Sequence, residues 1–487
     1  MKQNRTPVPW GTRPNALAIF AWLAASLAGA PVFAEPEAPN VLFISVDDLR
    51  PELNALGVEY IHSPVMDSLV KEGRAFTRHF VQAPTCGASR YALLTGKYAS
   101  SRVQRNNAAL FSVAAKADEK PYSLPRYFRE NGYRTVAVGK ISHHPGGMGG
   151  KNWEDPEEPE MPGAWDVKRM PTGPWKHPKG AMHGYVDGKA RIPGETPAFE
   201  HKEGDDFSYP DGWITREALK QMDGLAKNEE PFFLAIGIMK PHLPFATPKS
   251  YRDKYDGVEL PPIPHPEKPE GLSTWHESGE FFGRYRHEPG MDPRENPAYA
   301  DLIRRSYAAC VSYADAQVGK LLAHLQRTGL AENTIVVLWG DHGWHLGEHA
   351  VWGKHTLYEE SLLSPLVIRT PGMEKRGGKT DAIVESVDLY PTLCELTKIK
   401  IPDGLAGRSL VKHLKDPLAE GEPALSYWRE AETIRTPQYR LIRHRTIGGA
   451  VYELYDHSGN DGESTNIAAS KPVVVADLNA LIERKLN

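Results

Sequence analysis

Short, fully apolar runs alternate with amphipathic stretches between residue 40 and about residue 340. Four of these runs have the length and composition of buried strands: 40–46 (NVLFISV), 133–139 (YRTVAVG), 231–238 (PFFLAIGI) and 334–340 (TIVVLWG). Stretches with apolar positions at helical spacing separate them. Repeated helix-then-strand units predict an α/β fold, in which a mostly parallel central sheet is flanked by helices on both faces.

Four stretches carry helix signals. Residues 63–73 begin with Ser63 at the N-cap position, followed by proline, and end in glycine. The other three predicted helices are 122–132, 213–228 and about 297–328.

Two segments interrupt this alternation of strands and helices, 144–211 and 257–296. Both are rich in Gly, Pro, Trp and charged residues and have weak periodicity. We interpret them as long insertions over the sheet and not as separate domains.

The pattern changes again at about residue 421. Short strand-like runs at 424–428, 439–445 and 451–456 precede a helical stretch at 473–486. The sequence therefore predicts a small antiparallel subdomain over 421–487, which follows a main α/β domain over 35–420.

The N-terminal residues 1–34 have the order of a secretory signal. Basic residues and no acids occupy 1–15, the apolar run 16–30 follows, and the small residue Ala34 marks the expected cleavage site. A membrane anchor is the alternative, but about 15 apolar residues fall short of a full span. Because no second long apolar run follows, we expect an exported protein (periplasmic or secreted) without stable membrane insertion.

The charge of the chain gives no reason to expect a nucleic-acid partner. Removing the three positive charges of the signal changes the formal net charge from -4 to -7. A mildly acidic protein lacks the electrostatic attraction for phosphate backbones that a basic one has.

Charged residues follow each of the four predicted strands. They are Asp47 and Asp48, Lys140 and His143, Lys240 and His242, and Asp341 and His342. Ligands of open α/β sheets bind beyond the carboxyl ends of the strands. A helix N-cap explains a single aspartate after a strand. Four charged strand ends at one edge of a sheet favour a functional site.

The acidic members of this set predict a metal site. Asp47, Asp48 and Asp341 would repel one another if they were packed together without a cation. Carboxylates are the ligands that hard divalent ions such as Ca²⁺ and Mg²⁺ prefer. His342 either completes this shell or orients Asp341 by a hydrogen bond.

The basic members predict an anion pocket beside the metal. Arg90, Lys140, His143, His242 and Lys354 would suit a tetrahedral oxyanion ester, either sulfate or phosphate.

Neighbouring histidines compete with these assignments. They are His144, His345, His349 and His355. In DHGWHLGEH, His342, His345 and His349 have helical spacing, which could indicate a transition-metal site. The glycines of this segment favour a loop instead.

The three cysteines are not equivalent. Cys310 and Cys394 lie in apolar helical patterns and are predicted to be small buried residues, with a disulfide between them as the alternative. Cys86 lies in PTCGASRYALLTG, ahead of a predicted helix over 89–94 that Gly96 ends.

Three interpretations of Cys86 compete. A helix start would lower the pKa of a thiol and bind an anion. A phosphatase-type thiolate, however, needs five residues between cysteine and arginine, and only three separate Cys86 from Arg90. A buried structural cysteine would not need the arginine. The third interpretation is that Cys86 is the precursor of a modified residue.

The segment CGASR followed by LLTG resembles the type I sulfatase signature, Cys-X-Pro/Ala-Ser-Arg, in which the cysteine is oxidised to formylglycine (3-oxoalanine). VLFISVDDLRPEL, VGKISHHPG, KPHLPF and WGDHGWHLGEHAVWGKH resemble further sulfatase segments, in the expected order between about residues 38 and 410. DGESTNIA matches a late turn. Within the alkaline phosphatase superfamily, DDLRP and DHGW…LGEH resemble the iduronate-2-sulfatase-like members.

The resemblance implies a metal site and a modified nucleophile. It assigns one divalent metal, Ca²⁺ or alternatively Mg²⁺, to Asp47, Asp48, the residue made from Cys86, Asp341 and His342. A hydrated aldehyde at residue 86 would offer one hydroxyl to attack sulfur and a second whose deprotonation expels sulfate. The resemblance further implies a formylglycine-generating maturation enzyme as a partner.

The resemblance also implies roles for the basic residues. Arg90 and Lys140 would hold the modified residue, and His143 would act as the base. His242 and Lys354 would contact the sulfate and the leaving oxygen.

The expected activity is hydrolysis of sulfate esters of a sulfated sugar or polysaccharide. Two alternatives remain: a phosphodiester or phosphonate monoester hydrolase on the same scaffold, and a non-catalytic carbohydrate-binding protein. Aromatic and basic residues of the insertions suit a polyanionic glycan or simple loop packing, so they receive no roles. They are Trp165, Arg169, Trp175, Lys176, His177, Arg284, Arg286 and His287.

Overall fold

The computed structural model describes Met1 and residues 38–114, 118–144, 160–269, 279–374 and 376–486. Residues 38–487 form one compact unit. The predicted signal segment lies outside the described residues apart from Met1, as do 145–159 and 270–278 of the two insertions.

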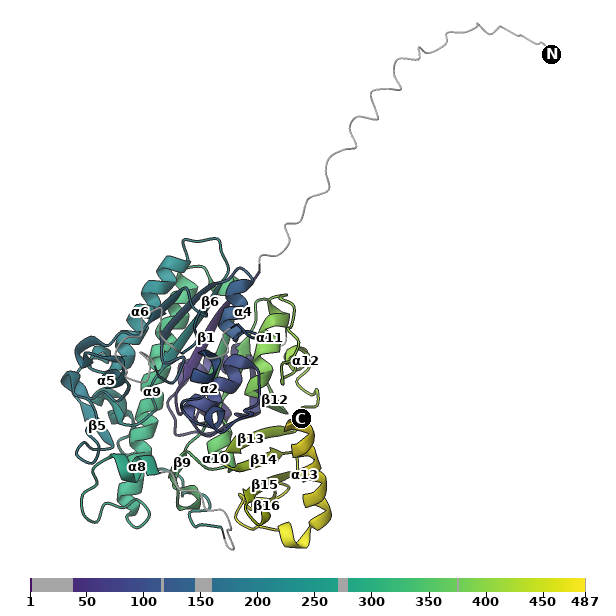
Figure 1. The fold of residues 1–487 in the computed structure, drawn as a ribbon. Helices are drawn as coiled ribbons and strands as arrows, with labels where there is room; N and C mark the ends of the chain where they lie inside the picture. The colour runs from purple at the N-terminus through teal and green to yellow at the C-terminus, as the bar shows by residue number, and fades with distance from the viewer. Residues whose placement is uncertain (2–37, 115–117, 145–159, 270–278, 375, 487) are drawn as a thin grey trace. The chain divides into compact units, whose positions relative to one another are not determined.

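The centre of the fold is a large sheet with helices on both faces (Figure 1). Its strands, in spatial order, are β12 (Gly378–Glu385), β2 (Arg74–Phe80), β11 (Leu366–Arg369), β8 (Thr334–Gly340), β1 (Asn40–Val46), β6 (Phe232–Ile238), β3 (Arg134–Gly139) and β4 (Val167–Arg169). Among these, only β11 runs antiparallel to its neighbours. The predicted mostly parallel sheet is confirmed, and the four predicted strands are its adjacent strands β8, β1, β6 and β3.

The register of these strands brings their carboxyl ends together. Val46, the last residue of β1, pairs with Ile238 of β6 on one side and Gly340 of β8 on the other. Gly139 ends β3 beside Gly237 of β6. The residues that follow the four strands therefore start from one edge of the sheet, as predicted.

Alternating side chains of β1 supply the two cores. Leu42 and Ile44 belong to the core that includes α1 (Pro64–Glu72), α6 (Pro210–Leu225) and α9 (Pro297–Arg327). Val41 and Phe43 belong to the core that includes α2 (Cys86–Thr95), α4 (Leu124–Glu130) and α11 (Leu389–Leu396). All residues of β1 are buried, which is the pattern of a strand covered on both faces.

The four predicted helices are all present. They are α1 (Pro64–Glu72), α4 (Leu124–Glu130), α6 (Pro210–Leu225) and α9 (Pro297–Arg327). The other α-helices of the main part are α2 (Cys86–Thr95), α3 (Phe111–Ala114), α5 (Pro178–Met182), α7 (Lys249–Arg252), α8 (Gly279–Arg284), α10 (Glu359–Leu362), α11 (Leu389–Leu396) and α12 (Val411–Lys415). No helix among the described residues is both long and apolar enough to cross a bilayer.

The insertions are more structured than their composition predicts. The first contributes β4 to the edge of the main sheet and β5 (Phe199–Lys202), which pairs with β7 (Phe245–Pro248). The second contains α8. A two-stranded hairpin, β9 (His345–Leu346) and β10 (Trp352–Gly353), lies in the loop after β8.

The C-terminal residues form the predicted small antiparallel sheet. Its strands are β13 (Ala424–Trp428), β14 (Ala431–Arg435), β15 (Tyr439–Thr446) and β16 (Gly449–Asp456), followed by α13 (Pro472–Leu486). Leu478 and Ile482 of α13 pack on this sheet. Strand β14 escaped prediction because its Glu432 and Arg435 are charged; both are buried in ion pairs with Arg443 and Glu359.

Candidate functional site

The turn after β1 presents two buried carboxylates. Asp47 and Asp48 are both fully buried. Asp48 has a left-handed backbone (φ 58°), and its carbonyl accepts a hydrogen bond from the Tyr307 hydroxyl at 2.8 Å. The Asp48 backbone N–H donates to the Asp341 carboxylate at 2.8 Å. This turn therefore fixes all three predicted metal carboxylates relative to one another.

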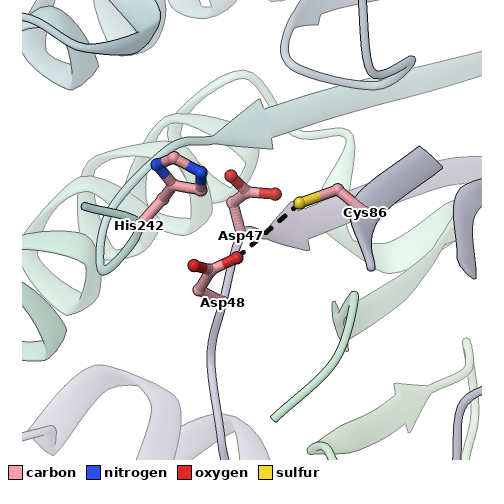
Figure 2. Close-up of side chains that lie close together, drawn as sticks. All are labelled: Asp47, Asp48, Cys86 and His242. Atoms are coloured by element: carbon pink, nitrogen blue, oxygen red, sulfur yellow. Dashed lines mark hydrogen bonds between the residues drawn. The ribbon is translucent and has the colours of Figure 1, made fainter. Parts of the chain in front are cut away.

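Cys86 is the first residue of α2, three residues earlier than predicted, and Gly96 ends the helix in a left-handed conformation as predicted. Its Sγ is 3.3 Å from His342 Nε2, 3.5 Å from Lys354 Nζ and 3.6 Å from Lys140 Nζ. Asp48 Oδ1 lies 3.7 Å from the same sulfur, and Figure 2 shows the thiol directed at the Asp48 carboxylate with Asp47 and His242 alongside. Residues from four distant segments thus meet at one sulfur atom.

The start of α2 depends on a close backbone approach at Gly87. Its N–H donates to Asn107 Oδ1 at 3.0 Å, and the Thr85 hydroxyl donates to the same oxygen at 2.9 Å. A Cβ on Gly87 would lie 2.4 Å from the Asn107 Cα. Asn107, which the sequence did not single out, therefore anchors the loop that presents Cys86.

We expect Gly87→Ala to lower the free energy of unfolding by about 1–3 kcal/mol, the usual cost of overpacking, because the new methyl group meets backbone atoms. Gly224→Ala is the matched control. Gly224 lies in α6, and a Cβ added there would meet no atom within 4 Å outside the adjacent helix backbone, so this change should be neutral or slightly stabilising. Urea denaturation of both variants measures the difference. Equal stability of the two variants would contradict the close approach.

Arg90 joins two of the carboxylates. Its Nη2 atom is 2.8 Å from Asp47 Oδ1 and 3.0 Å from Asp341 Oδ2, and Nη1 donates to the Lys140 carbonyl at 2.6 Å. Arg90, Asp47 and Asp341 are almost fully buried. A planar guanidinium that bridges two buried carboxylates fixes their spacing as a lysine could not.

Two lysines lie between the carboxylates and the cysteine. Lys140 Nζ contacts Asp47 Oδ2, and Lys354 Nζ donates to both Asp48 oxygens at 2.8 and 3.0 Å. Burial opposes the charge on Lys354, but the nearby Asp48 and the Cys86 sulfur raise its pKa well above the ordinary value. Both lysines therefore carry positive charge beside residue 86.

The predicted metal ligands form two overlapping groups. Asp47, Asp48, Cys86 and His242 make one, and Asp48, Cys86, Asp341 and His342 make the other. Within each group the ligand atoms lie within 4.8 Å of one another. Buried carboxylate oxygens grouped this closely fit a hard divalent cation. The structure thus brings every predicted ligand together and adds His242 to one group.

The environment sets the protonation of the carboxylates and the thiol. Burial raises the pKa of Asp48 to about 6. Burial acts in the same direction on Asp47, but Lys140, His242 and Arg90 outweigh it and hold the Asp47 pKa well below its usual range. Burial and the charge of Asp47 raise the pKa of the Cys86 thiol well above normal.

The expectation that the helix start lowers the Cys86 pKa is therefore wrong. The cost of burying a thiolate beside carboxylates exceeds the stabilisation from the two lysines. A protonated thiol is a poor nucleophile. This result disfavours a phosphatase-type thiolate.

His143 and His242 lie at the ends of β3 and β6. His143 Nδ1 is buried without a hydrogen-bond partner, and His242 Nδ1 lies 2.6 Å from the Leu243 carbonyl. Burial first, and then nearby lysines, lower the pKa of both rings well below normal. Lys240 points elsewhere: its Nζ donates to the carbonyls of His242 at 2.9 Å and Pro244 at 2.5 Å, so it shapes the loop.

The neighbouring histidines that competed with His143, His242 and His342 in the sequence lie at different places in the structure. The segment after β8 is a loop and hairpin, as its glycines predict. His345 and His349 lie with Glu360, apart from the group that contains His342. His355 lines the pocket above Cys86 and stacks on Trp428 at 4.8 Å between ring centroids. His144 lines the same pocket.

Cys310 and Cys394 are free and buried, so the disulfide alternative is wrong. Cys310 lies in α9 and Cys394 in α11, as their apolar patterns predict.

A pocket of about 1180 Å³ opens above Cys86. Its lining includes His143, His242 and Lys354, together with residues that the sequence did not single out. These are Asn106, Asn107, Lys179, His183, Arg191, Glu280, Trp428 and Arg429. They come from the loop after α2, from the two weakly periodic insertions, and from the end of β13 and the turn that follows it, where the sequence offers no positional signal.

Of the unassigned insertion residues, His177 and Arg284 line this pocket. Trp175 instead belongs to the core, and Trp165 packs 6.2 Å from the ring of Phe233.

Comparison with known proteins adds an independent finding. A family model described as sulfatase matches residues 39–399, and one described as N-sulphoglucosamine sulphohydrolase, C-terminal, matches residues 347–487. The chain is 30% identical to iduronate 2-sulfatase of Homo sapiens over 459 residues, which cover 80% of this chain and 77% of the relative.

Solved structures share the fold. A structure described as a complex with its substrate D-glucosamine-2-N,6-O-disulfate has a TM-score of 0.71 at 22% identity and covers 92% of this chain and 98% of its own. A phosphonate monoester hydrolase from Silicibacter pomeroyi has a TM-score of 0.70 at 24% identity and covers 92% and 94%. At these identities the likeness establishes the fold alone.

Proposed function

Because the chain belongs to the sulfatase family and is a sulfuric ester hydrolase, we propose that it removes sulfate from a sulfated carbohydrate through a formylglycine made from Cys86. The observation that carries this proposal is the convergence of His342, Lys354 and Lys140 on Cys86 Sγ within 3.3–3.6 Å. A buried thiol with a raised pKa has no evident use in that setting unless it is converted to another group.

Asp47, Asp48, Asp341 and His342 would hold a divalent metal, Ca²⁺ or alternatively Mg²⁺, with the modified residue 86 as a further ligand. Their close grouping supports this assignment. A bound cation would neutralise charge on the sulfate oxygens and lower the pKa of a hydroxyl beside it, which would make that hydroxyl a stronger nucleophile.

The aldehyde hydrate at residue 86 would supply a hydroxyl nucleophile and a second hydroxyl whose loss of a proton releases sulfate. Lys140 lies close enough to residue 86 to orient it, and Arg90 fixes the carboxylates around it. His143, whose pKa is lowered and whose Nδ1 is unpartnered, is suited to accept a proton. Lys354 and His242 would contact the sulfate and the leaving oxygen.

A sulfated sugar is the proposed substrate class. The pocket is lined by several arginines, lysines and histidines, which suit an anionic glycan. The name of the relative iduronate 2-sulfatase refers to a sulfated iduronate, and the similar solved structure is described as a complex with a disulfated glucosamine.

The proposal predicts a modified peptide and a preference among esters. After co-expression with a formylglycine-generating enzyme, the tryptic peptide that contains Cys86 should show the mass of the aldehyde. The same material should cleave p-nitrophenyl sulfate at least tenfold faster, by kcat/KM, than the phosphate, phosphodiester or phosphonate monoester analogues. A panel of sulfated monosaccharides then identifies the preferred sugar.

Intact cysteine together with full sulfatase activity would overturn the formylglycine mechanism. Faster turnover of the phosphonate or phosphodiester would support the alternative hydrolase activity. Sugar binding without turnover of any ester would support a binding protein.

Two further assignments belong to the proposal. Residues 1–34 would be removed during export, which N-terminal sequencing of the secreted protein checks. The division into a catalytic domain over 35–420 and a C-terminal subdomain over 421–487 is checked by limited proteolysis.

A further inference from the structure

One carboxylate stands out in the pocket above Cys86. Among the described lining residues, the charged side chains are otherwise basic: Lys179, Arg191, Arg284, Lys354 and Arg429. Glu280, on α8, is the only acidic residue of that lining. Its side chain is 16% exposed, so it is largely removed from bulk water. A buried acid in an anion pocket opposes anion binding and therefore needs a reason.

Glu280 contacts the groups nearest to the reaction centre. Its Oε2 is 3.5 Å from Lys354 Nζ, which is itself 3.5 Å from Cys86 Sγ. Its Oε1 is 3.8 Å from His242 Nε2 and 3.8 Å from Arg191 Nη1. Three side chains from separate segments thus hold this carboxylate at a fixed place above residue 86.

The basic groups around Glu280 favour the ionised form of its carboxylate. Burial alone would raise its pKa, but Lys354, His355, His183 and Arg191 outweigh burial and lower the pKa to about 2. An ionised carboxylate accepts hydrogen bonds and donates none. It attracts a hydroxyl or amide N–H and repels a sulfate or carboxylate at the same distance.

The contacts of Glu280 place it on the leaving-group side of the ester. In the proposed function, Lys354 and His242 contact the leaving oxygen, which is the oxygen bonded to the sugar. The Glu280 carboxylate is within 4 Å of both groups. If they contact the leaving oxygen, Glu280 would lie beside the sugar carbon that carries the ester and the substituents of the neighbouring carbon.

We infer that Glu280 is a specificity-determining residue: it accepts a hydrogen bond from a hydroxyl or N–H beside the sulfated carbon and disfavours sugars with a second sulfate there. The inference rests on the proposed function, because it takes Lys354 and His242 as the groups at the leaving oxygen. It adds a preference for a particular neighbour of the ester, which a purely basic pocket would not have.

A comparison of the wild type and a variant on matched substrates tests this inference. Wild type and Glu280→Gln, which keeps the size of the side chain, are assayed on three probes. These are the sulfated monosaccharide that the wild type cleaves fastest, its analogue with the neighbouring donor replaced by hydrogen, and p-nitrophenyl sulfate. Glu280→Gln should lower kcat/KM on the parent sugar about 10- to 100-fold relative to the aryl sulfate, as expected for a hydrogen bond to a charged group.

The deoxy analogue isolates the contact. Wild type should already lose most of that factor on it, and the glutamine variant should lose little more, because glutamine offers only a weaker, uncharged acceptor and the analogue has no donor for either side chain. On a fourth probe, the parent sugar with a second sulfate on the neighbouring carbon, the variant should gain at least threefold relative to the parent sugar. Glu280→Asp, which keeps the charge but shortens the reach, should fall between the two proteins.

Glu288→Gln is the matched control, since Glu288 lies in the same segment, is exposed and forms an ion pair with Arg286 at 3.1 Å. It should change none of these ratios. An equal loss on all three probes would mean that Glu280 positions Lys354 or His242, and unchanged ratios would mean that it has no role; both overturn the inference. Wild type that carries formylglycine but cleaves no aryl sulfate would contradict the proposed function instead.

Discussion

Cys86→Ala is expected to lower kcat for sulfate-ester hydrolysis by about 10⁵-fold or more, because it removes the atom from which the proposed nucleophile is made. The fold should persist. Lys140 and Lys354 keep their carboxylate partners Asp47 and Asp48 when the sulfur is removed, so no buried charge loses its main counter-ion. Turnover of p-nitrophenyl sulfate and a thermal unfolding curve measure the two properties on the same sample.

Cys310→Ala provides the matched control, since Cys310 is also buried and unpaired but lies in α9, outside the pocket. This variant should lose some stability because it leaves a small cavity, yet its kcat should stay within about twofold of the wild type. Activity in Cys86→Ala close to that of Cys310→Ala would contradict the covalent mechanism. A loss of fold in Cys86→Ala alone would show that the thiol has a structural role.

The sequence predicted the central strands well because each combines a buried apolar run with a clear end. Strands β1, β6 and β8 are buried at every position, and the helix-then-strand order predicts that they run parallel. Strand β2 (RAFTRHF) was missed because basic and apolar residues mix in it. Its Arg74 is buried and donates to the Leu414 carbonyl. Tertiary partners that the sequence does not reveal make such a strand possible.

Some residues of the site were likewise predictable from the sequence and others were not. Asp47, Asp341 and the basic residues at the strand ends were predictable because the ends of parallel strands meet. Glu280 and Arg191 were not, because their positions depend on how weakly periodic insertions pack over the sheet. The protonation of Cys86 was also beyond a local argument, since burial and the charge of Asp47 outweigh the helix start.

Removal of divalent metal is expected to abolish activity reversibly while leaving the protein folded. The structure explains both halves of this expectation. Arg90 bridges Asp47 and Asp341, Lys140 pairs with Asp47, and Lys354 pairs with Asp48, so each carboxylate has a counter-charge within the chain. The chain can therefore tolerate loss of the ion, but Lys354 would then be held by Asp48 and less able to contact the sulfate.

Dialysis against EDTA should lower kcat/KM by about 10³-fold or more, since a bound cation contributes several kcal/mol to stabilising charge in the transition state. Circular dichroism should remain native, and unfolding should shift to a lower temperature as expected when a bound ligand is lost. Separate addition of Ca²⁺ and Mg²⁺ then identifies the ion that restores activity. Full activity in a sample shown by elemental analysis to contain no divalent metal would overturn the metal assignment.

Asp341→Asn sharpens the test. One carboxylate fewer should raise the Ca²⁺ or Mg²⁺ concentration needed for half-maximal activity at least tenfold. Asp315→Asn is its control, because Asp315 is also buried but belongs to neither ligand group. Its carboxylate accepts hydrogen bonds from the backbone N–H groups of Val65 and Met66. The control should lose stability without changing the metal dependence. If both variants shifted that dependence equally, the effect would reflect general destabilisation, and Asp341 would lose its place among the ligands.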